Sequence, residues 1–142
     1  MKNLTTKLMI TAAALVAAAN VASAQTMEAK IPFAFRADGT VLAAGTYRVT
    51  VQHAMSGPVV IIEGAKPGQH LISLAVPNGE AKEAWKSAGD AVLSFRCGVS
   101  RCVLTDMWIG AGAPTYKLPT PSLGKDEPVH TAEIPMHMVK GD

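Results

Sequence analysis

Hydrophobic and polar residues alternate along much of the chain, which is the pattern of half-buried β-strands. The clearest case is residues 46–52, where Tyr47, Val49 and Val51 fall on one face and polar residues fall on the other. Residues 59–63 instead form a run dominated by β-branched residues, which predicts a strand buried on both faces or near the middle of a sheet. These segments predict a protein built mainly of β-sheet.

Turn-forming residues divide this pattern into short strands. Asp38 and Gly39 both tolerate positive φ and predict a tight turn. Residues 31–36 alternate, but Pro32 cannot donate a ladder hydrogen bond. We therefore expect this strand to lie at a sheet edge or to begin there, after a frayed lead-in at residues 25–30. Turn signals recur about every ten residues, which favours an all-β fold: a small antiparallel sandwich or barrel of about six to eight strands.

The only two cysteines, Cys97 and Cys102, lie on either side of a turn within a predicted hairpin at residues 91–110. A zinc site needs four ligands, and no second Cys/His pair lies nearby at a supporting spacing. A redox pair normally has the spacing Cys-x-x-Cys at the start of a helix, whereas the flanking residues here are typical of strands. We therefore predict a structural disulfide that staples the hairpin.

Pairing the two cysteines sets the register of the hairpin. The residues that would face each other are Phe95 and Leu104, Leu93 and Asp106, and Ala91 and Trp108. Asp106 then falls on the apolar face that includes Leu93 and Trp108. It is either a solvated or paired carboxylate at the rim of that face, or a candidate ligand-binding residue.

Residues 80–87 are the one segment of helical composition, and they are too few to form a stable isolated helix. We expect a single turn or a loop, with Trp85 folded back onto the protein as a plug. The alternative is that Trp85 forms a platform for a ligand, and Trp108 is the second candidate of this kind.

The composition of the chain changes after Gly110, because five of the nine prolines lie within residues 114–135. Such a density disfavours helices and central strands. Residues 110–142 are therefore expected to be an extended segment that wraps the surface or is partly mobile. Within this segment, residues 132–139 alternate and could rejoin the sheet as an edge neighbour of residues 29–35, which have a similar pattern.

The first 24 residues have the features of a secretory signal peptide. Lys2 and Lys7 precede an apolar run at residues 8–19, and the small residues at 22–24 match a site for signal peptidase. The run is shorter than the roughly 20 residues that span a bilayer. We therefore expect cleavage, a single domain at residues 25–142, a periplasmic or extracellular location, and no membrane insertion after cleavage.

Removal of this segment changes the charge balance. Two of the 13 Lys and Arg residues lie within it, which leaves 11 to balance the 11 Asp and Glu residues. A net charge near zero argues against nucleic acid or an anionic membrane as a partner. The expected partner is instead an unidentified protein or a polymer of the cell envelope.

No combination of residues predicts catalysis or a cofactor. The four histidines lack the spacings of metal-binding motifs, and no Gly-x-Ser-x-Gly element marks a nucleophile. The exception to consider is Met136, His137 and Met138, because thioether and imidazole groups suit copper. Alternation places His137 on the face opposite the two methionines, and a core strand with an exposed histidine explains the same residues.

Two stretches carry a resemblance to a known family: residues 31–49, and the hairpin with its Leu93–Phe95 and Leu104–Trp108 segments. They resemble a group of small exported acidobacterial proteins with an opening of the form IPFxF…LPAGTYxV and a later hairpin of the form LxF…LxxxW. The similarity covers roughly residues 29–118. This chain departs from the family in having Ala43 where proline is usual, and in its cysteine pair. The resemblance implies export and a compact β fold, and it assigns no active site.

These observations favour an exported, non-enzymatic β domain that acts as a structural or interaction module of the cell envelope. The alternative is a binder of a small ligand, which would be an apolar molecule, a glycan or copper. A barrel that encloses a cavity of several hundred Å³ would favour the ligand binder. A filled core with an open sheet edge would favour the interaction module.

Overall fold

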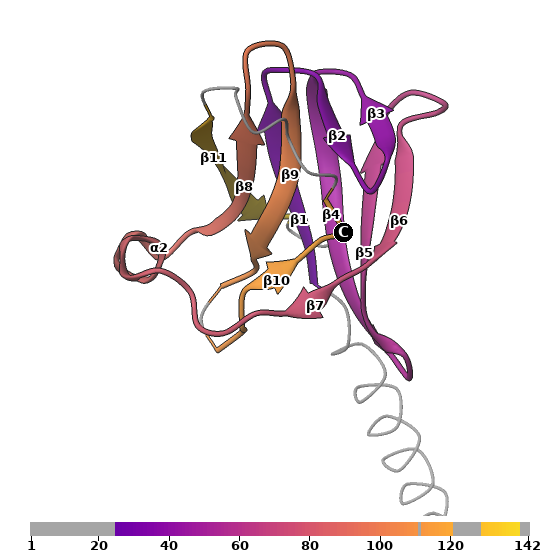
Figure 1. Ribbon diagram of the computed structural model, residues 1–142. Helices are drawn as coiled ribbons and strands as arrows, with labels where there is room; N and C mark the ends of the chain where they lie inside the picture. The colour runs from indigo at the N-terminus through magenta and orange to yellow at the C-terminus, as the bar shows by residue number, and fades with distance from the viewer. Residues whose placement is uncertain (1–24, 111, 121–128, 140–142) are drawn as a thin grey trace, which may run out of the picture.

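The computed structural model describes residues 25–110, 112–120 and 129–139, which form eleven short strands and one helix (Figure 1). This confirms the predicted all-β class, with more strands than expected. The elements are β1 (Gln25–Ile31), β2 (Phe35–Ala37), β3 (Thr40–Leu42), β4 (Gly45–Ala54), β5 (Gly57–Gly64), β6 (His70–Leu74), β7 (Val76–Pro77), α2 (Glu83–Ala88), β8 (Ala91–Cys97), β9 (Cys102–Trp108), β10 (Tyr116–Lys117) and β11 (His130–Met138). Within these ranges, no helix has the length and hydrophobicity to cross a bilayer. The expected signal peptide lies outside the described residues.

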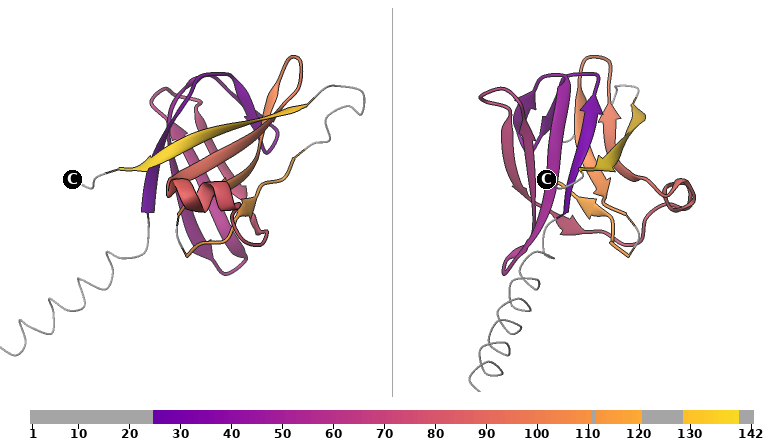
Figure 2. Two further views of the ribbon diagram at one scale, coloured as in Figure 1. Left: turned by 90° about the vertical axis from the view of Figure 1, so that its left-hand side faces the viewer. Right: turned by 180° about the vertical axis from the view of Figure 1, so that it is seen from behind.

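The strands form one sheet in the order β3-β2-β9-β8-β11-β1-β4-β5-β6, and this sheet curls into a nearly closed barrel (Figure 1, Figure 2). Neighbouring strands are antiparallel, except that β2 and β9 are parallel. At one end the barrel closes, because β7 follows directly after β6 and pairs with β10, which pairs with β9. At the other end, hydrogen bonding is interrupted between β3 and β6.

Aromatic rings fill the middle of the barrel. Phe35 lies edge-to-face against both Tyr47 and Phe95, with ring centroids 5.4 Å apart in each pair. Phe33 packs against Phe95 in the same manner at 5.1 Å. Such pairs contribute about 1 kcal/mol each beyond the area that they bury. The interior of the barrel is therefore occupied by protein side chains.

The alternation expected at residues 46–52 is confirmed in β4, where Tyr47, Val49 and Val51 belong to the core. The Tyr47 hydroxyl donates a hydrogen bond of 2.6 Å to the carbonyl oxygen of Ala43, which ties β4 to the preceding turn. Burial raises the pKa of the Tyr47 phenol. Tyr47 thus has a structural role.

The turn predicted at Asp38 and Gly39 joins β2 to β3. Both residues have positive φ, of 46° and 78°, as two-residue hairpin turns that match the twist of a sheet require. Ala37 and Thr40 form the last pair of the ladder on either side of this turn. The prediction is therefore confirmed at the level of the backbone.

Pro32 does not place its strand at a sheet edge. Residues 25–30, in which we expected a frayed lead-in, form β1 together with Ile31. This strand pairs with β4 on one side and with β11 on the other. The strand ends at Ile31, and Pro32 follows it outside the ladder. The prediction was wrong because the strand forms upstream of the proline and not around it.

The C-terminal stretch is the neighbour of β1 that its similar pattern suggested, but β11 is a central strand between β8 and β1 (Figure 2). Strand β11 tolerates Pro135 because an N–H at this position would point toward β1, where the ladder has already ended, and not toward β8. The N–H of Val139 donates to the Thr26 carbonyl. The backbone N–H and C=O groups of odd-numbered residues in β11 therefore point toward β1, and those of even-numbered residues point toward β8. The ladder with β1 contains Glu28 and His137 but stops before Pro135. The proline therefore removes no donor from the ladder with β8.

Cys97 and Cys102 form the predicted disulfide, with an S–S distance of 2.06 Å, at the closed end of the β8–β9 hairpin. They are direct partners in the ladder, and Phe95 and Leu104 face each other as expected. The staple thus fixes the register of the hairpin next to the turn.

A β-bulge shifts the other half of the hairpin by one residue. Thr105 has no partner on β8, and its hydroxyl donates to the carbonyl oxygen of Ser94 at 3.2 Å. The predicted pairs that involve Asp106 and Trp108 are therefore wrong, because strict alternation does not reveal an inserted residue. The pairs beyond the bulge are Ser94 with Asp106, Leu93 with Met107, and Val92 with Trp108.

Reduction of the disulfide is expected to lower the free energy of unfolding by about 2 kcal/mol, because the cross-link restricts the unfolded chain. Urea unfolding with and without dithiothreitol measures the difference. The control is the C97A/C102A double variant, whose stability should not respond to the reductant. Equal stability of the oxidised and reduced protein would contradict the prediction.

Candidate functional site

A second, smaller hydrophobic cluster lies outside the barrel, between α2 and the outer face of the β8–β9 hairpin. Its buried members are Ala81, Trp85, Val92 and Trp108. The bulge creates this cluster, because the shift in register turns Trp108 away from the barrel interior, where alternation had placed it. Trp85 reaches the cluster from α2, which projects from the side of the barrel in Figure 2.

Both tryptophans are held by hydrogen bonds as well as by packing. Trp85 Nε1 donates to Glu133 Oε2 of β11 at 2.7 Å, and Trp108 Nε1 donates to the Ala113 carbonyl at 3.1 Å. The Lys82 ammonium lies 5.0 Å from the centre of the Trp85 ring. Trp85 is 5% exposed and Trp108 is 3% exposed, so neither offers an open ring face to a ligand. Trp85 has the packing role that the plug interpretation assigned to it.

A groove of about 660 Å³ runs beside this cluster. Trp108, Ala113 and Pro114 line it, together with the two charged residues Glu80 and Lys86. These two form an ion pair at 3.2 Å, so the charges that line the groove neutralise each other. The groove is thus lined by apolar residues and by one exposed ion pair.

Asp106 does not lie on the inner face of the barrel. The bulge pairs it with Ser94 of β8, and on its other side it pairs with Lys117 of β10. Its side chain is partly exposed, which removes the inconsistency in the hairpin pattern. In the part of the chain that the structure describes, no three His, Cys, Asp or Glu side chains gather closely enough to hold a metal ion. Asp106 is therefore not part of such a cluster.

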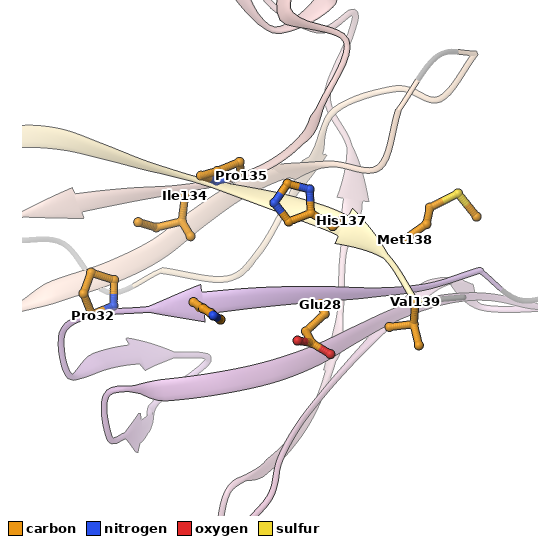
Figure 3. A pocket seen from close by; sticks show the side chains of 8 residues that line it. Glu28, Pro32, Ile134, Pro135, His137, Met138 and Val139 are labelled. Atoms are coloured by element: carbon orange, nitrogen blue, oxygen red, sulfur yellow. The ribbon is translucent and has the colours of Figure 1, made fainter. Parts of the chain in front are cut away.

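A cleft of about 580 Å³ opens between β1 and β11, as Figure 3 shows. It begins where the ladder between these strands stops, next to Pro135. Ile134 of β11 and Pro32, just after β1, face each other across the gap, while Glu28 and His137 lie where the strands are still paired (Figure 3). The cleft is thus a direct consequence of the interrupted ladder.

The three residues that were considered as copper ligands differ in burial and do not all share one face of β11. Met136 is 2% exposed inside the barrel, whereas His137 is exposed on the outer face, in register with Glu28. Met138 is 60% exposed and in register with Met27. Met27 was missed by the sequence analysis, because only the pairing of two distant strands brings it beside the C-terminal methionines.

A continuous apolar surface lies along the outer face of β5 and β6. Ile72 is 58% exposed and Leu74 is 56% exposed, and their partners on β5, Ile61 and Val59, are half-buried on the same face. Val76, just beyond β6, extends this surface. Contiguous apolar patches of this kind mark interaction sites more often than isolated apolar residues do.

The same residues of β6 present unpaired backbone groups. The N–H of Ala75 donates to the Pro58 carbonyl of β5, so the odd-numbered residues here point their backbone groups toward β5. The N–H and C=O groups of His70, Ile72 and Leu74 therefore point away from it. No strand within the described ranges pairs with this side of β6.

Comparison of the chain with protein-family models, with curated proteins and with solved structures finds no match. Functional inference therefore comes from the residues and geometry of this chain.

Replacement of Glu133 by alanine is expected to lower the free energy of unfolding by about 1 kcal/mol, because the buried indole N–H of Trp85 loses its acceptor. Denaturation followed by tryptophan fluorescence measures the loss. The matched control is Glu133→Gln, which keeps an acceptor oxygen and should retain most of the stability. An equal loss in both variants would show that the hydrogen bond is not the cause.

Proposed function

We propose that this protein is an exported, non-enzymatic interaction module of the cell envelope. It binds an extended segment of another protein along the free edge of β6. The observation that carries the proposal is the coincidence, at Ile72 and Leu74, of unpaired backbone groups with exposed apolar side chains. In this mode of binding, backbone hydrogen bonds supply affinity, and alternate side chains supply specificity.

The edge of β6 lacks the features that normally prevent strand addition. Proteins protect exposed edges with charged side chains, prolines or bulges. Residues 71–76 contain neither a charged residue nor a proline, and only His70, 3.6 Å from Glu63, adds polarity at one end. Further along the chain, Val76 is already paired with Lys117. The free edge is therefore the five residues of β6, which fits one short partner strand.

The filled interior favours this function over the binding of a small ligand inside the barrel. Phe35, Tyr47 and Phe95 occupy the centre and are at most 1% exposed. A barrel that binds a ligand internally needs an enclosed cavity of several hundred Å³. The groove beside the tryptophan cluster and the cleft between β1 and β11 both lie on the outer surface.

Export is part of the same proposal. The disulfide is compatible with an oxidising compartment, where such bonds persist. The charged start, apolar run and small residues of the first 24 positions support removal of a signal peptide. The resemblance to exported acidobacterial proteins supports the same location.

A photo-crosslinking residue at Ile72 or Leu74 is expected to capture one and the same protein from the envelope fraction of the producing cells. Because a partner strand would run alongside β6, the crosslinks from the two positions should map to nearby residues of one extended segment. Mass spectrometry of the adducts identifies the partner and the crosslinked residues.

The control position is Val99, which is 78% exposed in the β8–β9 turn and should not capture this partner. A variant with Ile72→Lys and Leu74→Lys should lose the partner and keep its circular dichroism spectrum, since both side chains are exposed. Absence of adducts at β6, crosslinks to a polysaccharide, or the same adducts from Val99 would overturn the proposal.

A further inference from the structure

Three methionines lie together at one end of the barrel. Met27 of β1 and Met138 of β11 are direct partners in an antiparallel ladder, so their side chains lie on the same face of the sheet. Met136 is two residues from Met138 along β11 and therefore shares that face. Strand pairing thus places three methionines, from segments that are far apart in the sequence, on one face of the sheet.

These methionines line one pocket of about 360 Å³, at the end of the barrel where β8 begins and β9 ends. Met27 is 4% exposed, Met136 is 2% exposed and Met138 is 60% exposed. The cluster therefore has two buried members and one at the opening to solvent. Asp90 and His137 are the titratable residues among those that line the pocket.

We propose that Met27, Met136 and Met138 form a binding site for Cu(I). Thioethers are soft, uncharged ligands, and they select the monovalent copper ion over harder divalent ions. Thiolates would compete for the same ion, but both cysteines are joined in the disulfide. The described residues hold no cluster of His, Cys, Asp and Glu that would favour a different metal.

The ordinary role of methionine as a flexible filler of apolar cores explains only part of this arrangement. It accounts for Met27 and Met136, which pack within the hydrophobic core. It does not account for Met138, which fills no gap because most of its side chain is exposed. In the proposed site, the exposed side chain of Met138 would meet the ion first, and the two buried methionines that line the same pocket would complete its ligands.

The proposal gives His137 no role as a ligand, although this residue is among those that line the pocket. Alternation along β11 directs its side chain to the opposite face, where it is in register with Glu28. The three proposed ligands do not titrate, so binding requires no loss of a proton from the protein.

The test is an anaerobic titration of the oxidised protein with Cu(I) in competition with a chromogenic chelator. We expect one ion per protein. Met138→Leu should weaken binding by at least the roughly tenfold that loss of even an outer-sphere partner costs. The matched control is Met55→Leu, because Met55 is fully exposed at the turn between β4 and β5 and belongs to no cluster. His137→Ala should bind as the unaltered protein does.

A second measurement uses Ag(I), which has the same charge and preference for soft ligands, with protein labelled at the methionine methyl groups. The resonances of Met27, Met136 and Met138 should shift, while those of Met55 and Met107 should not. Failure of the protein to compete for Cu(I), equal affinities of the Met138→Leu and Met55→Leu variants, or loss of binding in His137→Ala would overturn the proposal.

Discussion

One inserted residue in the β8–β9 hairpin determines much of the arrangement of this molecule. The hairpin lies centrally in the sheet, because β9 pairs with β2 and β10 while β8 pairs with β11. Thr105 shifts the alternation of β9, so that Met107 points into the barrel and Trp108 points outward to the cluster that holds α2. The disulfide fixes the register at the closed end, and the bulge resets it beyond Leu104. The hairpin therefore contributes side chains to two hydrophobic clusters, one on each of its faces.

Backbone hydrogen bonding explains where the surface of the barrel is open and where it is closed. The ladder between β1 and β11 stops at Pro135, which has no N–H to donate toward β1, and a cleft opens there. The short strand β10 covers the edge at Val76. None of the described strands covers the edge of β6, along which Ile72 and Leu74 lie. The cleft between β1 and β11 thus results from an interrupted ladder, whereas the edge of β6 is the side of a strand that pairs with no other described strand.

Features that depend on residues close together in the sequence were predictable. They include the all-β class, the turn at Asp38 and Gly39, and the disulfide next to the hairpin turn. The bulge was not predictable, because a polar residue such as Thr105 fits the alternating pattern whether it is paired or inserted. The edge strand and the methionine cluster depend on which distant strands become neighbours. Pro32 indicated the wrong edge. The pattern shared by residues 29–35 and 132–139 suggested neighbouring strands, but it did not give the register that pairs Met27 with Met138.

The position of β11 also bears on when the barrel can form. Of the described strands, β1 comes first and β11 lies furthest along the chain, yet they are neighbours, and β11 separates β1 from β8. The sheet between β1 and β8 is therefore incomplete until residues 130–138 pair with both strands. Contacts between such distant segments carry a large entropic cost of loop closure and form slowly. The strand order thus makes the pairing of β11 with β1 and β8 a late step in the formation of the barrel.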